Sequence, residues 1–143
     1  MLLRNMTIAD YDKVFSLWMG TAGMGLRSLD DSPSGIEKFL RRNPTTCFVA
    51  EEDGVLAGVI LCGHDGRRGY IYHAAVQPDF RRKGVGKQLV DAVLNALKAE
   101  GILKAVLFVF QTNQTGNDFW ESQGFDKRED LVYRSISLND ANV

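Results

Sequence analysis

The most informative stretch of this chain is Val76-Gln77-Pro78-Asp79-Phe80-Arg81-Arg82-Lys83-Gly84-Val85-Gly86-Lys87-Gln88-Leu89. An apolar run ends here, a basic loop with glycines follows, and a helical pattern begins. A helix N-terminus carries unpaired N–H groups and a partial positive charge, so it binds phosphate well. Gly84 and Gly86 have no Cβ and let an anion approach the backbone. With the positive charges of Arg81, Arg82 and Lys83, the segment predicts a pyrophosphate site.

Two common nucleotide loops do not fit these residues. A Walker A loop needs glycine at position 81 and Ser or Thr after Lys87, where this chain has Arg81 and Gln88. A Rossmann fingerprint that starts at Gly84 needs glycine or alanine in place of Leu89. An ordinary solvated basic turn at a helix start stays open as the alternative.

The rest of the chain alternates between strand and helix patterns around this loop. Asp53-Gly54 between two apolar runs is a strong hairpin signal. Glycines and adjacent aspartates make the stretch from Gly20 to Asp31 a loop. This order predicts an α/β or α+β sheet with helices on both faces. The expected strands are 2–6, 46–51, 55–62, 70–77, 104–110 (buried on both faces) and 131–138; the expected helices start at Thr7 and span 34–42, 84–100 and 117–123.

Length and composition fit one domain that spans residues 1–143. The formal net charge of −1 argues against a nucleic-acid binder. No apolar stretch approaches the roughly 18 residues of a membrane span, and the first residues lack the apolar core of a signal peptide. Cys47 and Cys62 lie in apolar runs and are expected to be reduced core residues of a cytoplasmic protein. Neither cysteine has zinc-site spacing to a histidine, so no metal site is expected.

Arg81-x-x-Gly84-x-Gly86, preceded by Ala74-Ala75-Val76-x-Pro78, resembles motif A of the GNAT N-acetyltransferases. Farther along, Trp120-Glu121-Ser122-Gln123-Gly124-Phe125 is similar to motif B of that family. The resemblance covers nearly the whole chain, with the bacterial YpeA-like and RimI-like acetyltransferases as the nearest group. It implies a mixed, mostly antiparallel sheet of six to seven strands with about four helices and splayed central strands.

The resemblance also implies a function and a cofactor site. The expected reaction moves an acetyl group from acetyl-CoA to a primary amine of a small molecule or a protein N-terminus. The main chain of Ala74, Ala75 and Val76 would pair with the pantetheine arm, and the side chain of Asn113 would contact it. The pyrophosphate would bind the backbone of the loop formed by Arg81, Arg82, Lys83, Gly84, Val85, Gly86 and Lys87.

Two departures from the family pattern leave the acid and the base unassigned. Trp120 stands where the family often has a tyrosine that acts as the general acid. Phe108 stands where RimI-like proteins have a glutamate that acts as the general base. Tyr72 and His73 are the alternative catalytic candidates, because their strand should carry the acetyl group. Strand alternation places them on opposite faces unless the strand is bulged. Either residue could instead have only a core role. Two alternatives for the whole protein also stay open: that it is a non-catalytic acyl-CoA-binding module, and that it forms a homodimer.

Overall fold

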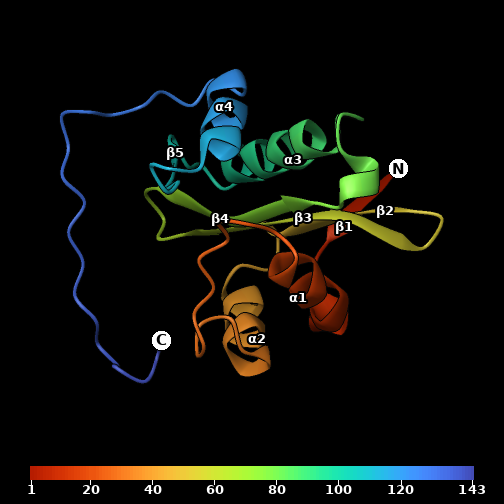
Figure 1. The fold of residues 1–143 in the computed structure, drawn as a ribbon, viewed down its shortest axis with the longest axis horizontal. Coiled ribbons are helices and arrows are strands. Elements are labelled where there is room, and N and C mark those ends of the chain that lie inside the picture. The colour runs from red at the N-terminus through yellow and green to blue at the C-terminus, as the bar shows by residue number, and fades with distance from the viewer.

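The computed structural model describes residues 1–143 and has a central sheet between two layers of helices (Figure 1). The sheet has the strand order β1-β2-β3-β4-β5. Strands β1 to β4 pair antiparallel, and β4 pairs parallel with β5, which confirms the mixed, mostly antiparallel sheet. The strands are β1 (Leu2–Asn5), β2 (Phe48–Glu52), β3 (Val55–His64), β4 (Gly69–Val76) and β5 (Ala105–Leu107).

Two helices cover each face of the sheet, as Figure 1 shows. On one face lie α1 (Tyr11–Met19) and α2 (Pro33–Arg42); on the other lie α3 (Val85–Ala99) and α4 (Gln114–Ser122). Short 3-10 turns occupy Ile8–Asp10 and Pro78–Phe80. Strand alternation divides the apolar residues between two cores. One core packs β2 and β3 on α1 and α2; the other packs β3 and β4 on α3.

The turns follow the local chemistry of the sequence. Asp53 and Gly54 both have positive φ angles, 51° and 77°, as a two-residue hairpin turn requires. Ser32 caps α2 by accepting a hydrogen bond from the N–H of Gly35 at 3.1 Å. The first turn has a capping box, in which Thr7 N–H donates to the Asp10 carboxylate. No helix of the chain is long and apolar enough to cross a membrane.

The C-terminal part of the chain differs from expectation. The predicted strand 131–138 does not form, and the sheet therefore has five strands. Its apolar side chains are exposed: Leu131, Val132, Tyr133, Ile136 and Leu138. An apolar segment forms a strand only where a neighbouring edge pairs with it, and the sequence pattern does not supply that edge. The segment instead passes around the molecule, and Ala141, Asn142 and Val143 contact the loop before α2 (Figure 1).

The strand expected at 104–110 is also shorter and less buried than predicted. Only Ala105–Leu107 pair with β4, up to the partners Ile71 and Leu107. Beyond this point the two segments are no longer paired, so Phe108 is 64% exposed. The early end of this pairing is the splay that the family resemblance implies.

Candidate active site

The splay leaves one edge of β4 unpaired. Residues of β4 beyond Ile71 have partners only on β3, where Val59 lies opposite Ala75 and Gly58 opposite Val76. Ala74, Ala75 and Val76 therefore present main-chain groups along an edge that no strand covers. An extended ligand can pair with such an edge in the way an added strand does.

The loop after β4 presents a row of free backbone donors. None of the N–H groups from Arg82 to Lys87 donates a hydrogen bond to another group of the protein. Arg82 and Gly84 have positive φ angles of 62° and 78°, while buried Val85 anchors the start of α3 in the core. A turn with left-handed residues at a helix N-terminus is well suited to an anion.

The basic side chains of this loop differ in their contacts. Arg81 Nε donates to the carbonyl oxygen of Val76 at 3.2 Å. Lys83 Nζ lies 5.5 Å from the ring centre of Phe80, and Lys87 forms an exposed ion pair with Asp91 at 2.7 Å. Arg82 is exposed and contacts no acidic group. Its charge is therefore available to a ligand.

The two glycines of the loop have different roles. Gly84 has a left-handed backbone and open space where a Cβ would lie. A Cβ on Gly86 would lie only 3.0 Å from Cε1 of Phe119 on α4. Packing of α4 against α3 thus explains Gly86 without any ligand. A larger side chain at position 86 would therefore press on the Phe119 ring.

Asn113 also has a structural role. Its Oδ1 caps α4 by accepting a hydrogen bond from the N–H of Gly116 at 3.0 Å. Its side chain lies close to Gly23 in the loop after α1. Asn113 therefore joins the two sides of the molecule next to the splayed strands.

A bulge in β4 places Tyr72 and His73 on the same face of the sheet. His73 and Ala74 lie opposite the single residue Ile60, and His73 has a positive φ of 47°. The ring of Tyr72 packs edge-on against Phe39 of α2 at 5.8 Å, and the ring of His73 lies 5.0 Å from Trp18 of α1. The placement on opposite faces expected from plain alternation is wrong, because the bulge shifts the alternation by one residue.

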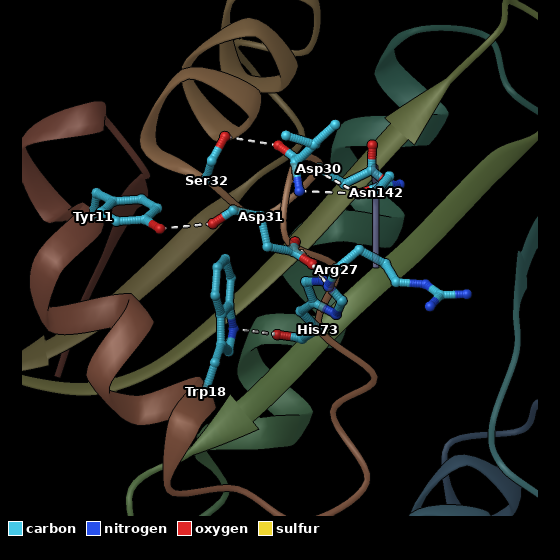
Figure 2. Close-up of polar contacts among 9 residues, drawn as sticks. Tyr11, Trp18, Arg27, Asp30, Asp31, Ser32, His73 and Asn142 are labelled. Atoms are coloured by element: carbon cyan, nitrogen blue, oxygen red, sulfur yellow. Dashed lines mark hydrogen bonds and ion pairs between the residues drawn. The ribbon is translucent and has the colours of Figure 1, made fainter. Parts of the chain in front are cut away.

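His73 makes a contact that sequence reasoning missed. Its Nε2 lies 2.8 Å from Oδ1 of Asp31, a residue of the loop before α2 (Figure 2). Asp31 is only 5% exposed and is the one buried carboxylate of the chain. The sequence shows it only as the second of two adjacent aspartates in a glycine-rich loop, which gives no sign of a histidine partner 42 positions away.

Tyr72 carries a free hydroxyl near the splay. It is 44% exposed, and its hydroxyl has no hydrogen-bond partner, whereas that of Tyr11 donates to the Asp31 carbonyl oxygen. Burial of the ring, followed by the nearby Tyr70 and Tyr133, raises the pKa of Tyr72 above its usual range. The phenol therefore stays protonated at neutral pH and is able to donate a proton.

The residues at the family's acid and base positions have apolar surroundings. Trp120 packs between Phe119 and Phe125, with ring centres 5.0 and 5.1 Å away. Phe108 contacts Tyr133 of the C-terminal segment, with ring centres 4.6 Å apart. Neither ring supplies a titratable group. No group of three His, Cys, Asp or Glu side chains is placed to hold a metal ion.

Several known proteins are similar to this chain in sequence or in fold. Residues 11–125 match the acetyltransferase (GNAT) family. An acetyltransferase of Yersinia enterocolitica is 29% identical over 87% of this chain and 86% of its own. One of Pectobacterium atrosepticum is 32% identical over 82% of each chain. The PaiA N-acetyltransferase of Thermoplasma acidophilum, solved in complex with coenzyme A, shares the fold with a TM-score of 0.75, at 21% identity over 87% of this chain and 89% of its own.

The family match spans the splayed strands, the donor-rich loop and α4, which are the parts that form the candidate site. The YpeA-like or RimI-like group stays a prediction. Since the match covers most of the chain, the protein belongs to the GNAT family of acetyltransferases and uses acetyl-CoA as its co-substrate.

Proposed function

We propose that the chain is a single N-acetyltransferase domain that moves the acetyl group of acetyl-CoA to a primary amine. The amine belongs to a small molecule or to a peptide N-terminus. The row of unpartnered N–H groups from Arg82 to Lys87 carries this proposal, because it lies directly after the free edge of β4. A ligand with a pyrophosphate and an amide-containing arm matches both features.

In this proposal the loop N–H groups and the Arg82 charge hold the pyrophosphate. The main chain of Ala74 to Val76 pairs with the pantetheine arm, and Asn113 lies beside it. The coenzyme A in the PaiA structure supports a ligand of this class. Main-chain donors also polarise the thioester carbonyl, so positioning and electrostatics lower the barrier.

The chemistry requires one proton acceptor and one proton donor. The amine nitrogen attacks the carbonyl carbon of the thioester, the C–N bond forms and the C–S bond breaks. His73 accepts the proton that the amine loses, directly or through water. Tyr72 donates a proton to the leaving thiolate, since the acidity of a phenol roughly matches that of a thiol.

We place the reaction in the cytoplasm, where thiols stay reduced. Cys47 and Cys62 are both free and buried. Burial raises the pKa of Cys47 to about 11 and that of Cys62 to about 12. Both thiols are therefore protonated and unreactive, as befits core residues.

The test is acetyl-CoA turnover with a panel of acceptors. Release of the CoA thiol is followed with polyamines, amino acids, amino sugars and peptides with free N-termini, and mass spectrometry identifies the acetylated product. We expect thiol release that depends on one class of amine. Intact CoA binding, measured by calorimetry, without amine-dependent thiol release would instead identify a non-catalytic acyl-CoA-binding module.

A further inference from the structure

The geometry points to Asp31 as a positioning residue that sets the tautomer of His73 and so makes Nδ1 the proton acceptor. This inference rests on the proposed function for its kinetic consequence, but the tautomer itself is measured independently. It concerns a contact between the loop before α2 and the bulge of β4 (Figure 2).

The backbone and ring of His73 are fixed from the α1 side. A left-handed conformation costs a residue with a side chain about 1–2 kcal/mol, so the surrounding structure must hold it in place. Trp18 Nε1–H donates to the carbonyl oxygen of His73 at 3.1 Å (Figure 2). The same indole packs edge-on against the imidazole ring. Trp18 is almost fully buried, which makes it a rigid support for the bulge.

The Asp31 carboxylate is held on both oxygens. Oδ1 faces His73 Nε2 at 2.8 Å, and Oδ2 accepts the backbone N–H of Arg27 at 2.7 Å. Tyr11 Oη donates to the Asp31 carbonyl oxygen at 2.6 Å. A buried carboxylate is costly unless it is hydrogen-bonded in this way. The two carboxylate contacts fix the plane of the Asp31 side chain with one oxygen toward the histidine, and the Tyr11 bond holds the backbone that carries it.

The partners determine which imidazole nitrogen carries the hydrogen. An ionised carboxylate only accepts hydrogen bonds, so Nε2 must be the donor in this pair. The neutral ring then has its lone pair on Nδ1. Nδ1 has no hydrogen-bond partner in the protein, and no buried side-chain nitrogen or oxygen lacks a partner. Nδ1 is therefore accessible from solvent, as an atom that takes a proton from an amine must be.

Once Nδ1 has taken that proton, the ring is an imidazolium that donates from Nε2 to Asp31. The contact with Asp31 is the same before and after the transfer, because Nε2 is the donor in both states. Asp31 acts through His73 and does not need to touch the acceptor amine.

Asp31→Asn tests the assignment because the Arg27 N–H remains a fixed donor. The carbonyl oxygen of the new amide must face Arg27 N–H, and its NH2 group must face His73. Nε2 then has to accept, which moves the ring hydrogen to Nδ1 and removes the base. We expect kcat to fall by about 100- to 10,000-fold with the best amine of the panel, with acetyl-CoA affinity unchanged.

The ring tautomer is read directly by NMR of protein labelled with ¹⁵N-histidine. The chain has only two histidines, and His64→Gln assigns the two sets of ring signals. Nδ1 of His64 accepts the N–H of Gly66 at 3.0 Å, so His64 is an Nε2–H reference that should not change. We expect His73 in the Nε2–H form in the wild-type protein and in the Nδ1–H form in Asp31→Asn.

Asp30→Asn is the matched control. Asp30 Oδ2 accepts from Asn142 Nδ2 at 2.9 Å and does not contact His73, and an asparagine there keeps the accepting oxygen. Its kcat and its His73 signals should equal those of the wild type.

The inference is overturned if wild-type His73 is already in the Nδ1–H form, a result that does not require any variant to fold. It is also overturned if folded Asp31→Asn keeps its kcat within twofold. If no amine is acetylated, the proposed function fails, and the wild-type tautomer still decides the role of Asp31.

Discussion

Tyr72 lies beside His73 on one face of β4, with a hydroxyl that makes no hydrogen bond within the protein. Because its pKa is raised, the phenol is the protonated acid throughout the neutral range. Tyr72→Phe should lower kcat by about 100- to 10,000-fold, the usual effect of losing one positioned acid. Acetyl-CoA affinity from calorimetry should stay the same.

Tyr70→Phe serves as the control for this variant. It removes the same hydroxyl from the same strand, at a position where β4 is still paired with Val106 of β5. Equal kcat values for the two variants would exclude Tyr72 as the acid. Loss of activity in Tyr72→Phe alone would assign it.

Gly86 allows a test of how closely α3 packs against α4. Its missing Cβ makes room for the Phe119 ring, so Gly86→Val should lower the free energy of unfolding by about 1–3 kcal/mol through overpacking. Combining it with Phe119→Leu should recover part of the loss, seen in urea denaturation as a coupling of at least about 0.5 kcal/mol. Strictly additive losses would show that the two residues do not compete for space.

Individual residues also show why the site was only partly predictable from sequence. The loop from Arg81 to Lys87 is a local signal, since charge, glycines and the helix start are adjacent in the chain. The pair of His73 and Asp31 depends on a bulge at a residue that is not glycine and on a long-range contact. No rule of sequence spacing encodes the bulge or the contact. The sequence therefore indicates His73 only as one catalytic candidate, and it gives no sign that Asp31 belongs to the site.

The two ends of helix α3 carry opposite partial charges from the helix dipole, positive at the N-terminus and negative at the C-terminus. Its N-terminus presents the free N–H groups, whereas Lys98 lies in its last turn. Arg82→Glu replaces an unpaired positive charge at the N-terminal end, so it should weaken acetyl-CoA binding about tenfold, which corresponds to about 1.4 kcal/mol. The loss should shrink at high salt, because exposed charges are screened.

Lys98→Glu makes the same change of charge at the far end of α3. It should leave the acetyl-CoA Kd from calorimetry unchanged, although it removes a favourable contact with the helix dipole. Similar losses of affinity in both variants would mean that net charge, not the loop, governs binding.

The elements with strong local patterns were predicted well. The helical pattern at 84–100 and the Asp53-Gly54 turn carry enough local information to fix an element. The strands at 104–110 and 131–138 were predicted too long or wrongly, because strand length depends on where a neighbouring edge ends. Here β4 leaves β5 after Ile71, and no sequence pattern marks that point.

At the scale of the whole molecule, the C-terminal residues are bound to the loop that carries Asp31. Asn142 Oδ1 accepts the N–H groups of Leu29 and Asp30 at 2.9 and 3.1 Å, and Ser28 N–H donates to the carbonyl oxygen of Val143 at 2.7 Å. Asn142→Ala should speed hydrogen exchange at the amides of Leu29 and Asp30 by about 2- to 10-fold, the effect of one lost hydrogen bond.

Asn95→Ala is a suitable comparison for that exchange experiment, because Asn95 is an exposed residue of α3. Exchange at Leu29 and Asp30 should match the wild type in this variant. Unchanged exchange in Asn142→Ala as well would mean that the loop is held without the C-terminal contact.

The contact of Val143 with Ser28 has a practical consequence for how the protein is tagged or immobilised. An affinity tag fused after Val143 starts at the atoms that hold the loop next to Asp31. A bulky fusion there would disturb the loop, and the resulting low turnover would be mistaken for an intrinsic property or a wrong acceptor. Met1 is exposed next to β1, at the opposite edge of the sheet from β5. Tags and surface linkages at that end leave the loop untouched, so acceptor screens belong on N-terminally tagged protein.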